Sequence, residues 1–403
     1  MLIGEEILKI LHTSDWHLGA KTDRRNRIGE QRAVMNELVS LADENKVDVV
    51  IVAGDIFDQA VPTSDAEELF YDTLEKLSAN NERVIIAFAG NHDDPKRLSA
   101  NRHFAKKHNI VLVGDLNPVC ELNAGNKNKV TEVGEGYVIV ESATNKGKER
   151  LAVAILPYPM EYRLNYKVDG ETYEEKVKAW ARVACKGFKR DTFNILATHL
   201  MVAGGTFVEN DYVRTFKVGD VNIVSKSDFP KADYYALGHI HDYQVIKDNM
   251  VYCSAPMKYS YSQKNCGAVI ISTNKDKLED FKFVPIKSAA KMEQVCVIGK
   301  ENIDASLSAF NENDIVELTL VQDSALTSKD IKEIKEKYPC VLQVKLQLTN
   351  LEQDNKVYIS GRDKLSSREL FVDFYKNKKG IEPSKEIVEL FLNLMEDNAG
   401  ETN

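Results

Sequence analysis

The stretch VDVVIVAGDIFD (Val47–Asp58) is typical of a buried strand that ends directly in polar residues. Its apolar run, Val47–Gly54, has about the length of one buried strand. Asp55 and Asp58 follow at once. In α/β sheets, sites form in the crevice beyond the carboxyl ends of the strands. The stretch therefore predicts an α/β fold with functional residues at one edge of a sheet.

The same arrangement recurs along the chain up to about Pro285. ILKILHTSD (Ile7–Asp15) and RVIIAFAGNHD (Arg83–Asp93) are further predicted strands that run into polar loops. RIGEQRAVMNELVSLADENK (Arg27–Lys46) has apolar residues at helical spacing. Glycine lets the backbone turn sharply and brings neighbouring side chains together. It stands immediately before three of the polar groups, at Gly54, Gly90 and Gly238.

The stretch YYALGHIHDYQ (Tyr234–Gln244) holds two of the chain's eight histidines within three positions. Taken alone, they are compatible with a metal pair, with a general acid beside a bystander, or with two ordinary loop residues. Residues two apart in an extended segment lie ~6–7 Å from each other. That separation suits two neighbouring ions with metal–nitrogen bonds of about 2 Å.

The polar residues at the strand ends form a set with one kind of chemistry. They are carboxylates, an amide and imidazoles, which suit Mn²⁺, Fe²⁺ or Zn²⁺ and not a structural thiolate zinc site. One ion rarely needs so many ligands, whereas two ions that share Asp55 need about this number and leave positions for water and substrate. The predicted ligands are Asp15, His17, Asp55, Asn91, His199, His239 and His241.

The net charge of −9 speaks against a nucleic-acid binder whose whole surface is basic. Two stretches, Lys21–Arg32 and Lys96–Lys107, are nevertheless strongly basic, and each follows one of the polar loops. Charge runs of this kind are either solvated faces or sites that hold phosphates. The candidates for DNA contacts are Lys21, Arg24, Arg25, Arg27, Lys96, Arg97 and Arg102.

The length of 403 residues predicts two or three domains. We expect domains at 1–286, at 287–350 (a small α/β domain) and at 351–403 (helical). The N-terminus lacks a basic segment before its apolar residues, and no apolar run is long enough to span a bilayer. The six cysteines are scattered without a CxxC pair. A cytoplasmic protein follows as the expectation.

The predicted C-terminal helices carry more apolar surface than they can cover themselves. A capping box at Ser366–Glu369 starts the first helix, Gly380 ends it, and a second helix follows Pro383. Apolar residues surround most of the second helix, so it packs either on its own body or on an external partner. The candidate contacts are Leu370, Phe371, Phe374, Ile387, Phe391 and Leu394.

Taken in order, these motifs resemble a known family. DWH, GDIFD, GNHD, His199 and GHIH are similar to the signature of calcineurin-like metallophosphoesterases. ILHTSDWHLG, IVAGDIFD, AGNHD, YYALGHIH and VYCSAPMKYSYSQ resemble segments of the bacterial SbcD branch of the meiotic-recombination-eleven nuclease family. The resemblance covers nearly the whole chain and is sharpest from Ile7 to about Gln263. It implies a β-sandwich flanked by helices, a capping domain and a C-terminal helical segment.

The resemblance also implies roles for individual residues. It implies that the ligands of one ion are Asp15, His17, Asp55 and His241. The ligands of the other ion, usually manganese, are Asp55, Asn91, His199 and His239. His92 matches a histidine that protonates or orients the leaving oxygen, and Asp58 matches a carboxylate that orients this histidine in phosphatase relatives.

The function implied by the resemblance is that of a DNA nuclease subunit for duplex ends, hairpins and single strands in DNA repair, recombination and replication. It also implies a homodimer and a coiled-coil ATPase partner, SbcC. One alternative is a small-substrate phosphoesterase, either a phosphatase or a cyclic-nucleotide phosphodiesterase. Another is an inactive scaffold that bridges DNA and partner, although the complete ligand set argues against it. The extra domain, the tail and the basic loops favour the nuclease.

Overall fold

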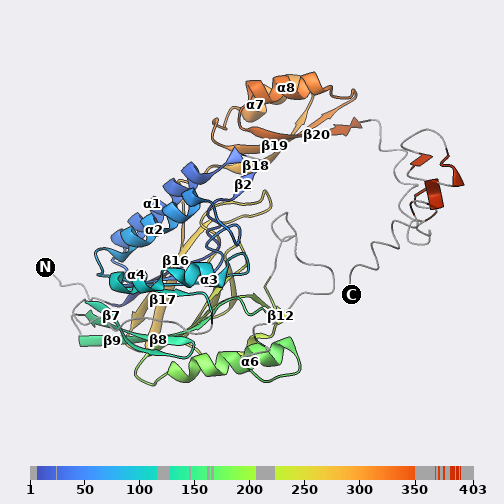
Figure 1. Cartoon of the computed structure of the whole chain (residues 1–403). Coiled ribbons are helices and arrows are strands. Elements are labelled where there is room, and N and C mark those ends of the chain that lie inside the picture. Colours follow the sequence, from blue (N-terminus) through green and yellow to red (C-terminus); the bar gives the residue numbers. More distant parts are fainter. Residues whose placement is uncertain are drawn as a thin grey trace. The chain divides into compact units, whose positions relative to one another are not determined.

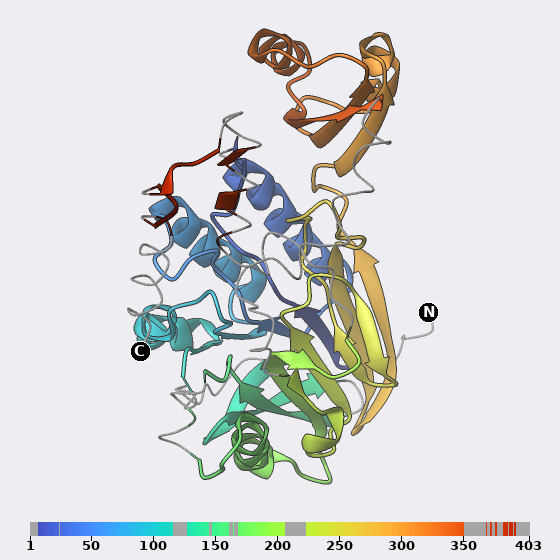
Figure 2. The same cartoon turned by 90° about the vertical axis from the view of Figure 1, so that its right-hand side faces the viewer.

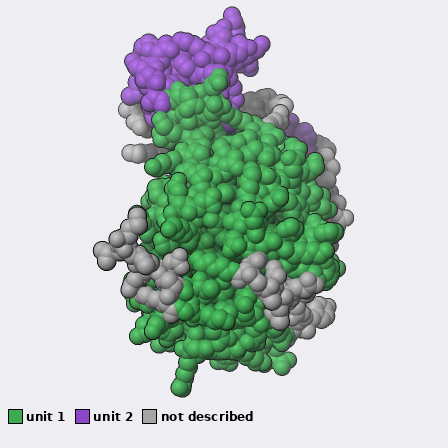
Figure 3. Space-filling view, turned by 90° about the vertical axis from the view of Figure 1, so that its left-hand side faces the viewer, with its two compact units in different colours: residues 1–294, 310–316 green, residues 295–309, 317–403 purple. Residues whose placement is uncertain are grey.

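The computed structural model describes residues 7–23, 25–115, 127–144, 147–160, 168–205 and 223–349. Outside these ranges it describes only 164, 368, 371–372, 375–376, 382–385, 387–389 and 391. Two compact units are distinguished in Figure 3. The first comprises Met1–Gln294 and Phe310–Val316, and the second comprises Val295–Ala309 and Glu317–Asn403.

The first unit is built on two large sheets. The first sheet has the order β17 (Lys277–Pro285), β16 (Gly267–Asn274), β1 (Lys9–Thr13), β4 (Val49–Ala53), β5 (Val84–Phe88) and β6 (Ile110–Val113). The second sheet has the order β14 (Gln244–Lys247), β15 (Met250–Tyr252), β13 (Tyr234–Gly238), β10 (Phe193–His199), β9 (Gly147–Leu156), β8 (Tyr137–Thr144) and β7 (Asn128–Gly134). β1, β4, β5 and β6 run parallel, as do β9, β10, β13 and β15.

The two sheets pack face to face because their central strands are apolar on both sides. In β4, Val49 and Ile51 lie in the core between the sheets, whereas Val50 and Val52 pack in the core with the helices. Figures 1 and 2 show helices on both outer faces of the sandwich. They are α1 (Ile28–Glu44), α2 (Ser64–Ser78), α3 (Pro95–Ala100) and α4 (Arg102–Ala105) on the first sheet, and α6 (Tyr173–Ala184) on the second. The predicted fold class, a β-sandwich flanked by helices, is confirmed.

Short elements complete the first unit and mark the loops near the sheet edge. Asp94 caps α3 by accepting a hydrogen bond from the Arg97 amide, and Pro95 is the first residue of the helix. Two-stranded ribbons are formed by β2 (Lys21–Thr22) with β3 (Arg25–Asn26), and by β11 (Met201–Val202) with β12 (Ile223–Val224). The 3₁₀ turns of this unit are η1 (Lys106–His108), η2 (Cys185–Gly187) and η4 (Lys226–Asp228), whereas η5 (Lys300–Asn302) belongs to the second unit.

The region after the sandwich has the predicted order of strand, helix, strand, helix and strand. These elements are β18 (Met292–Ile298), α7 (Ile303–Leu307), β19 (Ile315–Gln322), α8 (Ser328–Lys337) and β20 (Val341–Leu348). The strands form one sheet in this order. A capping box between Thr327 and Asp330 starts α8. The division between the two compact units passes through β18 and β19.

Candidate metal centre

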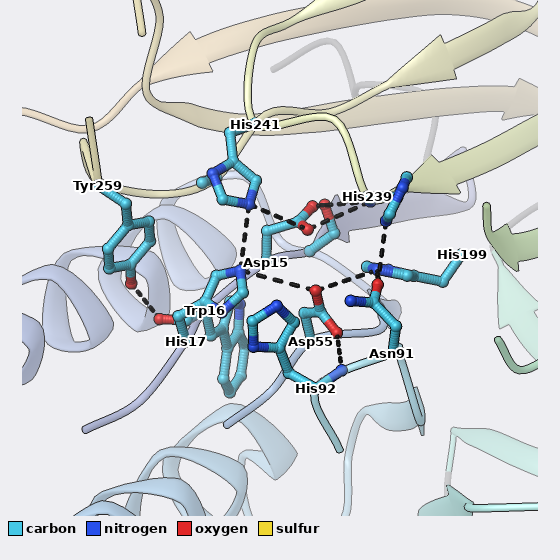
Figure 4. A network of polar contacts seen from close by, with 12 residues as sticks. Asp15, Trp16, His17, Asp55, Asn91, His92, His199, His239, His241 and Tyr259 are labelled. Carbon is cyan, nitrogen blue, oxygen red and sulfur yellow. Dashed lines mark hydrogen bonds and ion pairs between the residues drawn. The ribbon is translucent and has the colours of Figure 1, made fainter. Parts of the chain in front are cut away.

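Five parallel strands from both sheets end at one edge of the sandwich, and their polar residues converge there (Figure 4). The loops after β1, β4 and β5 carry five of these residues from the first sheet, and β10 and the loop after β13 carry three from the second. The structure therefore brings together all seven residues that the sequence predicts as metal ligands, and His92 with them.

One group of ligand atoms is formed by Asp15, His17 and His241, which lie within 4.8 Å of one another. The Nε2 atoms of His17 and His241 are 3.1 Å apart. His241 Nε2 lies 3.7 Å from Asp15 Oδ1. This group faces Asp55, whose Oδ2 is 3.7 Å from His17 Nε2.

The second group consists of Asp55, Asn91, His199 and His239. Asp55 Oδ2 lies 3.2 Å from His199 Nε2. Asn91 Oδ1 is 3.1 Å from His199 Nε2 and 3.0 Å from His239 Nδ1. Asp55 therefore lies between the two groups, in the position of a shared ligand.

The donor atoms fit two divalent cations. Oxygen and imidazole nitrogen atoms from separate loops face the same small volume, and Asp15 and Asp55 are 0% and 2% exposed. Buried carboxylates are unfavourable unless a cation or a proton compensates their charge. Oxygen and imidazole ligands are those of Mn²⁺, Fe²⁺ and Zn²⁺ sites.

Protonation of the centre would compete with the binding of ions. Burial lowers the pKa of His199, but the Asp55 and Asp15 carboxylates and the Ala53 carbonyl together raise it to about 9. Burial raises the pKa of Asp55, but His199, His17 and His92 together outweigh this effect, and the pKa lies well below its usual value. Because only the neutral imidazole binds a metal ion, ion binding displaces the His199 proton and weakens as the pH falls.

Removing divalent ions should destabilise the first unit. An ion that binds only the folded chain adds about 2.7 kcal/mol at 100 times its Kd. We expect EDTA to lower the unfolding temperature by several degrees, and Mn²⁺ in excess of the chelator to restore it, in differential scanning calorimetry. An unfolding temperature that does not respond to Mn²⁺ would contradict a metal centre in these residues.

All three glycines beside the site are required for clearance. A Cβ atom on Gly90 would lie 2.2 Å from Asp55 Oδ1, and one on Gly238 would lie 1.9 Å from the Ala53 carbonyl oxygen. Gly54 has a φ of +83°, and a Cβ atom on it would lie 2.3 Å from His199 Nδ1. The sequence predicted sharp turns at these glycines, whereas close approach of neighbouring groups is the requirement that all three share.

Four of the predicted ligands have backbone conformations that L-residues rarely adopt. The φ angles are 54° at Asp15, 42° at His17, 47° at Asp55 and 95° at His239. Such residues cost about 1–3 kcal/mol each and persist only where their surroundings fix them. Here the Asp15 amide donates to the Gly54 carbonyl and the His17 amide to the Asp55 carbonyl, both at 3.0 Å. The two loops thereby hold each other in place.

His92 lies beside the ligands and is oriented by the main chain. Its amide donates to Asp55 Oδ1 at 2.9 Å, and its Nδ1 donates to the Asp58 carbonyl oxygen at 2.8 Å. The Asp58 carboxylate lies with its Oδ1 3.9 Å from His17 Nδ1 and raises the pKa of His92, and its role in orienting His92 stays a prediction. Burial lowers the pKa of His92, but the Asp55 carboxylate and the Asp58 carbonyl outweigh it, and the net shift is upward.

Sequence reasoning assigned no role to Asp93, although the quoted GNHD motif contains it. Its buried carboxylate accepts hydrogen bonds from the amides of Ile56, Phe57 and Gly90, at 3.1, 2.9 and 2.8 Å. It thereby ties the loop after β4 to the loop after β5. Burial raises its pKa to about 6. The place of this aspartate within the GNHD motif was the available signal, but only the fold shows which amides it binds.

Two of the residues predicted to contact DNA are engaged in structural contacts. Arg25 donates to the carbonyl oxygens of residues 312, 313 and 314. Arg27 is 2% exposed and forms a two-bonded ion pair with Glu30. Burial of Arg27 speaks against a DNA contact by its guanidinium group, whereas for the half-buried Arg25 the contact stays a prediction.

The remaining basic candidates have different surroundings. Lys21 and Lys96 are exposed, and Arg102 is half-buried. Arg97 lies on the surface and pairs with Glu67 at 3.0 Å. Arg24 lies outside the described residues.

The described part of the tail contains one aromatic contact between the two predicted helices. The rings of Phe371 and Phe391 are stacked with centroids 4.0 Å apart. Ile387 is 37% exposed. Leu370, Phe374, Leu394, the predicted capping box and Gly380 lie outside the described residues.

The family model of the calcineurin-like phosphoesterases matches residues 8–243, which contain the whole centre. The chain therefore belongs to the calcineurin-like phosphoesterase family, whose members hydrolyse phosphoesters with divalent metal ions. It is 30% identical over 408 residues to the D chain of the SbcCD nuclease of Bacillus subtilis (strain 168), a match that covers 96% of this chain and 97% of that protein. The resemblance to the SbcD branch is thus confirmed.

Two solved structures also match, each at 14% identity. One is GAP50, the anchor in the inner membrane complex of Plasmodium, with a TM-score of 0.35 over 80% of this chain and 99% of that one. The other is TT1561 of Thermus thermophilus, with a TM-score of 0.32 over 62% and 90%. Among the described residues, no helix is both long and apolar enough to cross a membrane.

Proposed function

We propose that this chain is the manganese-dependent DNA nuclease subunit of a complex that processes double-strand breaks. It would act as an exonuclease on duplex ends and as an endonuclease on hairpins and single strands. The observation that carries the proposal is the pair of ligand groups that share Asp55, with His92 beside them. The similarity to a nuclease subunit over nearly the whole chain selects DNA as the substrate.

Asp15, His17, Asp55 and His241 would hold one manganese ion, and Asp55, Asn91, His199 and His239 would hold the other. When bound, the ions polarise the phosphodiester and lower the pKa of a water molecule that serves as the nucleophile. The side chains around them exclude bulk water from the buried carboxylates and fix where the phosphate must lie.

His92 would act as the general acid. Its Nδ1 is bound by the Asp58 carbonyl, so Nε2 is the nitrogen that faces the leaving oxygen of the scissile bond. A general acid must carry its proton, and the Asp55 carboxylate and the Asp58 carbonyl shift the pKa of His92 upward against the effect of burial. The part of Asp58 in this scheme is its main-chain carbonyl.

DNA phosphates would be held by the basic residues that remain accessible. Lys21, Lys96 and Arg102 follow the two loops that carry the ligands, and Arg97 could exchange Glu67 for a phosphate. Such contacts position the backbone without reading its sequence. Basic residues gathered at the site would allow a chain with a net charge of −9 to bind DNA.

The parts outside the sandwich fit assembly with an ATPase. We propose that 1–286 is the nuclease domain, that 287–350 is its capping domain and that 351–403 binds the coiled coil of an SbcC-type partner in the cytoplasm. The relative is itself one component of a complex named SbcCD. The Phe371–Phe391 stack supports a paired arrangement of the two tail helices, which would offer their other apolar residues to the partner.

A surface next to α2 and α4 supports a homodimer. Phe104 is 72% exposed at a groove of about 430 Å³ that Tyr71, Leu74 and Ile110 also line. A large exposed aromatic residue beside an apolar groove is typical of a protein interface.

We expect Phe104→Glu to convert the dimer to a monomer, because a charge would have to be buried in this apolar contact. Phe104→Leu is the matched control and should remain dimeric. Analytical ultracentrifugation at several concentrations measures the change. A wild type that sediments as a monomer at all concentrations, or a dimeric Phe104→Glu, would count against the interface.

The function is tested by comparing two kinds of substrate under Mn²⁺. The pure chain and its complex with the partner ATPase should degrade linear duplex DNA and open hairpins. Brisk hydrolysis of small phosphodiesters without cleavage of any DNA substrate would instead identify a small-substrate phosphoesterase.

A further inference from the structure

We propose that Tyr259 and Arg27 are positioning residues for one half of the metal centre, the group of Asp15, His17 and His241. This inference rests on the proposed two-metal function. It assigns a role to Arg27, whose charge the DNA proposal does not use, and to the segment 254–263, which lies outside the ligand motifs.

Tyr259 contacts the imidazoles of both histidines in this half. Its ring centroid lies 5.2 Å from that of His17 and 5.9 Å from that of His241, and both contacts are edge-to-face. Figure 4 shows the ring beside the two histidines, with its hydroxyl pointing to Trp16. The hydroxyl donates a hydrogen bond to the Trp16 carbonyl, directly before His17 in the chain. One side chain therefore restrains both rings and the backbone that carries one of them.

Arg27 contacts the Tyr259 ring and the main chain of the preceding residue. Its guanidinium carbon lies 5.7 Å from the centre of the Tyr259 ring. Nη1 donates to the Lys258 carbonyl at 2.7 Å, and Nε and Nη2 donate to the Glu30 carboxylate at 2.9 and 2.8 Å. A planar guanidinium can make these contacts at once because its donors have a fixed geometry, which lysine lacks.

The same segment holds the backbone of His241. The His241 carbonyl accepts hydrogen bonds from Ser254 Oγ at 2.8 Å, from the Ala255 amide at 3.0 Å and from Gln263 Nε2 at 3.1 Å. Gln263 Oε1 in turn accepts from the Tyr259 amide at 3.0 Å. The segment thus fixes the main chain of His241 and, through Tyr259, the orientation of its ring.

The other half of the centre is supported by different residues. His199 Nδ1 lies 2.8 Å from the Ala53 carbonyl, at the end of β4. The His239 ring lies 6.2 Å from Tyr158, which belongs to the loop after β9. Loss of Tyr259 should therefore weaken the binding of one ion and leave the binding of the other unchanged. A general loss of stability would not produce this asymmetry.

The test is isothermal titration calorimetry with Mn²⁺ alone on the full chain. Tyr259→Leu should weaken one of two sites by about 10–100-fold, the usual effect of removing a group that orients metal ligands, and change the other by less than about 3-fold. Tyr259→Phe keeps the ring and should lose less Mn²⁺ affinity at this site than Tyr259→Leu. Arg27→Lys should weaken the same site as Tyr259→Leu. At limiting Mn²⁺, electron paramagnetic resonance should show a mononuclear signal in Tyr259→Leu where the wild type shows a coupled pair.

The matched control is Tyr243→Leu, since Tyr243 lies two residues from His241 but packs its ring on Phe283 with centroids 4.6 Å apart. Equal weakening of both sites in Tyr259→Leu, unchanged affinities, or the same loss in Tyr243→Leu would each overturn the proposal. If Tyr259→Leu does not fold in calorimetry of the metal-free chain, Tyr259→Phe and Arg27→Lys decide the outcome in the same way. A wild type that binds fewer than two ions would contradict the proposed function itself, and not the positioning role alone.

Discussion

Asp55→Asn should abolish the binding of both divalent ions and reduce DNA cleavage by about 10³-fold or more. Asp55 is the residue that lies between the two ligand groups, 3.7 Å from His17 Nε2 and 3.2 Å from His199 Nε2. Asparagine keeps its size but loses its charge, so neither ion retains a shared anionic ligand. Bound metals supply several kcal/mol of transition-state stabilisation, and each 1.36 kcal/mol is about tenfold in rate.

Two controls separate this effect from a general loss of negative charge. Asp58→Asn retains the main-chain carbonyl and should still bind two ions in calorimetry. Asp65→Asn changes an aspartate in the first turn of α2 and should leave cleavage at the wild-type rate. If Asp55→Asn still binds two ions with wild-type affinity, Asp55 is not the shared ligand.

His92→Ala should lower kcat for DNA cleavage by about 10²–10⁴-fold while both ions remain bound. The reason is that His92 is proposed to supply a proton and is not among the proposed ligands. The loss should depend on the leaving group. A phosphodiester that releases p-nitrophenolate needs no proton, because that anion is stable in water, so its hydrolysis should fall much less than DNA cleavage.

Single-turnover measurements on both substrates, with metal binding checked by calorimetry, test this assignment. An equal fractional loss on the two substrates would show that His92 positions the phosphate without acting as an acid. Loss of one ion in His92→Ala would place this residue among the ligands instead. The His17, Asp55 and His92 ligand atoms do lie within 4.8 Å of one another, so the second outcome is a real alternative.

The metal centre was predictable from the sequence because each ligand follows an apolar strand. Strands such as Val49–Ala53 and Val84–Phe88 have a clear pattern, and parallel strands must end at a common edge. The same alternation of strands and helices predicts an α/β fold, whereas the sandwich of two sheets was implied only by the family resemblance. The strand–helix order after Lys287 could likewise be predicted from periodicity alone.

The supporting contacts were not predictable, because they depend on where distant loops meet. A run of basic residues gives no sign that Arg27 pairs with Glu30 and is covered by residue 258, over 200 positions away. Nor does an Asp four residues after a Gly reveal that its carbonyl, and not its carboxylate, binds His92. Long-range hydrogen bonds of this kind leave no periodic signal.

The unusual φ angles at Asp15, His17, Asp55 and His239 affect how such sequences change in evolution. Two requirements act on the residue at each of these positions. It must supply a metal-binding atom, and it must tolerate a positive φ, which asparagine, aspartate and histidine adopt far more readily than most residues. A lineage that no longer needs catalysis would still be restricted by folding to these three residue types and glycine. Its motif could therefore persist after its chemistry is lost, and measured ion affinity is better evidence of a working enzyme than the motif is.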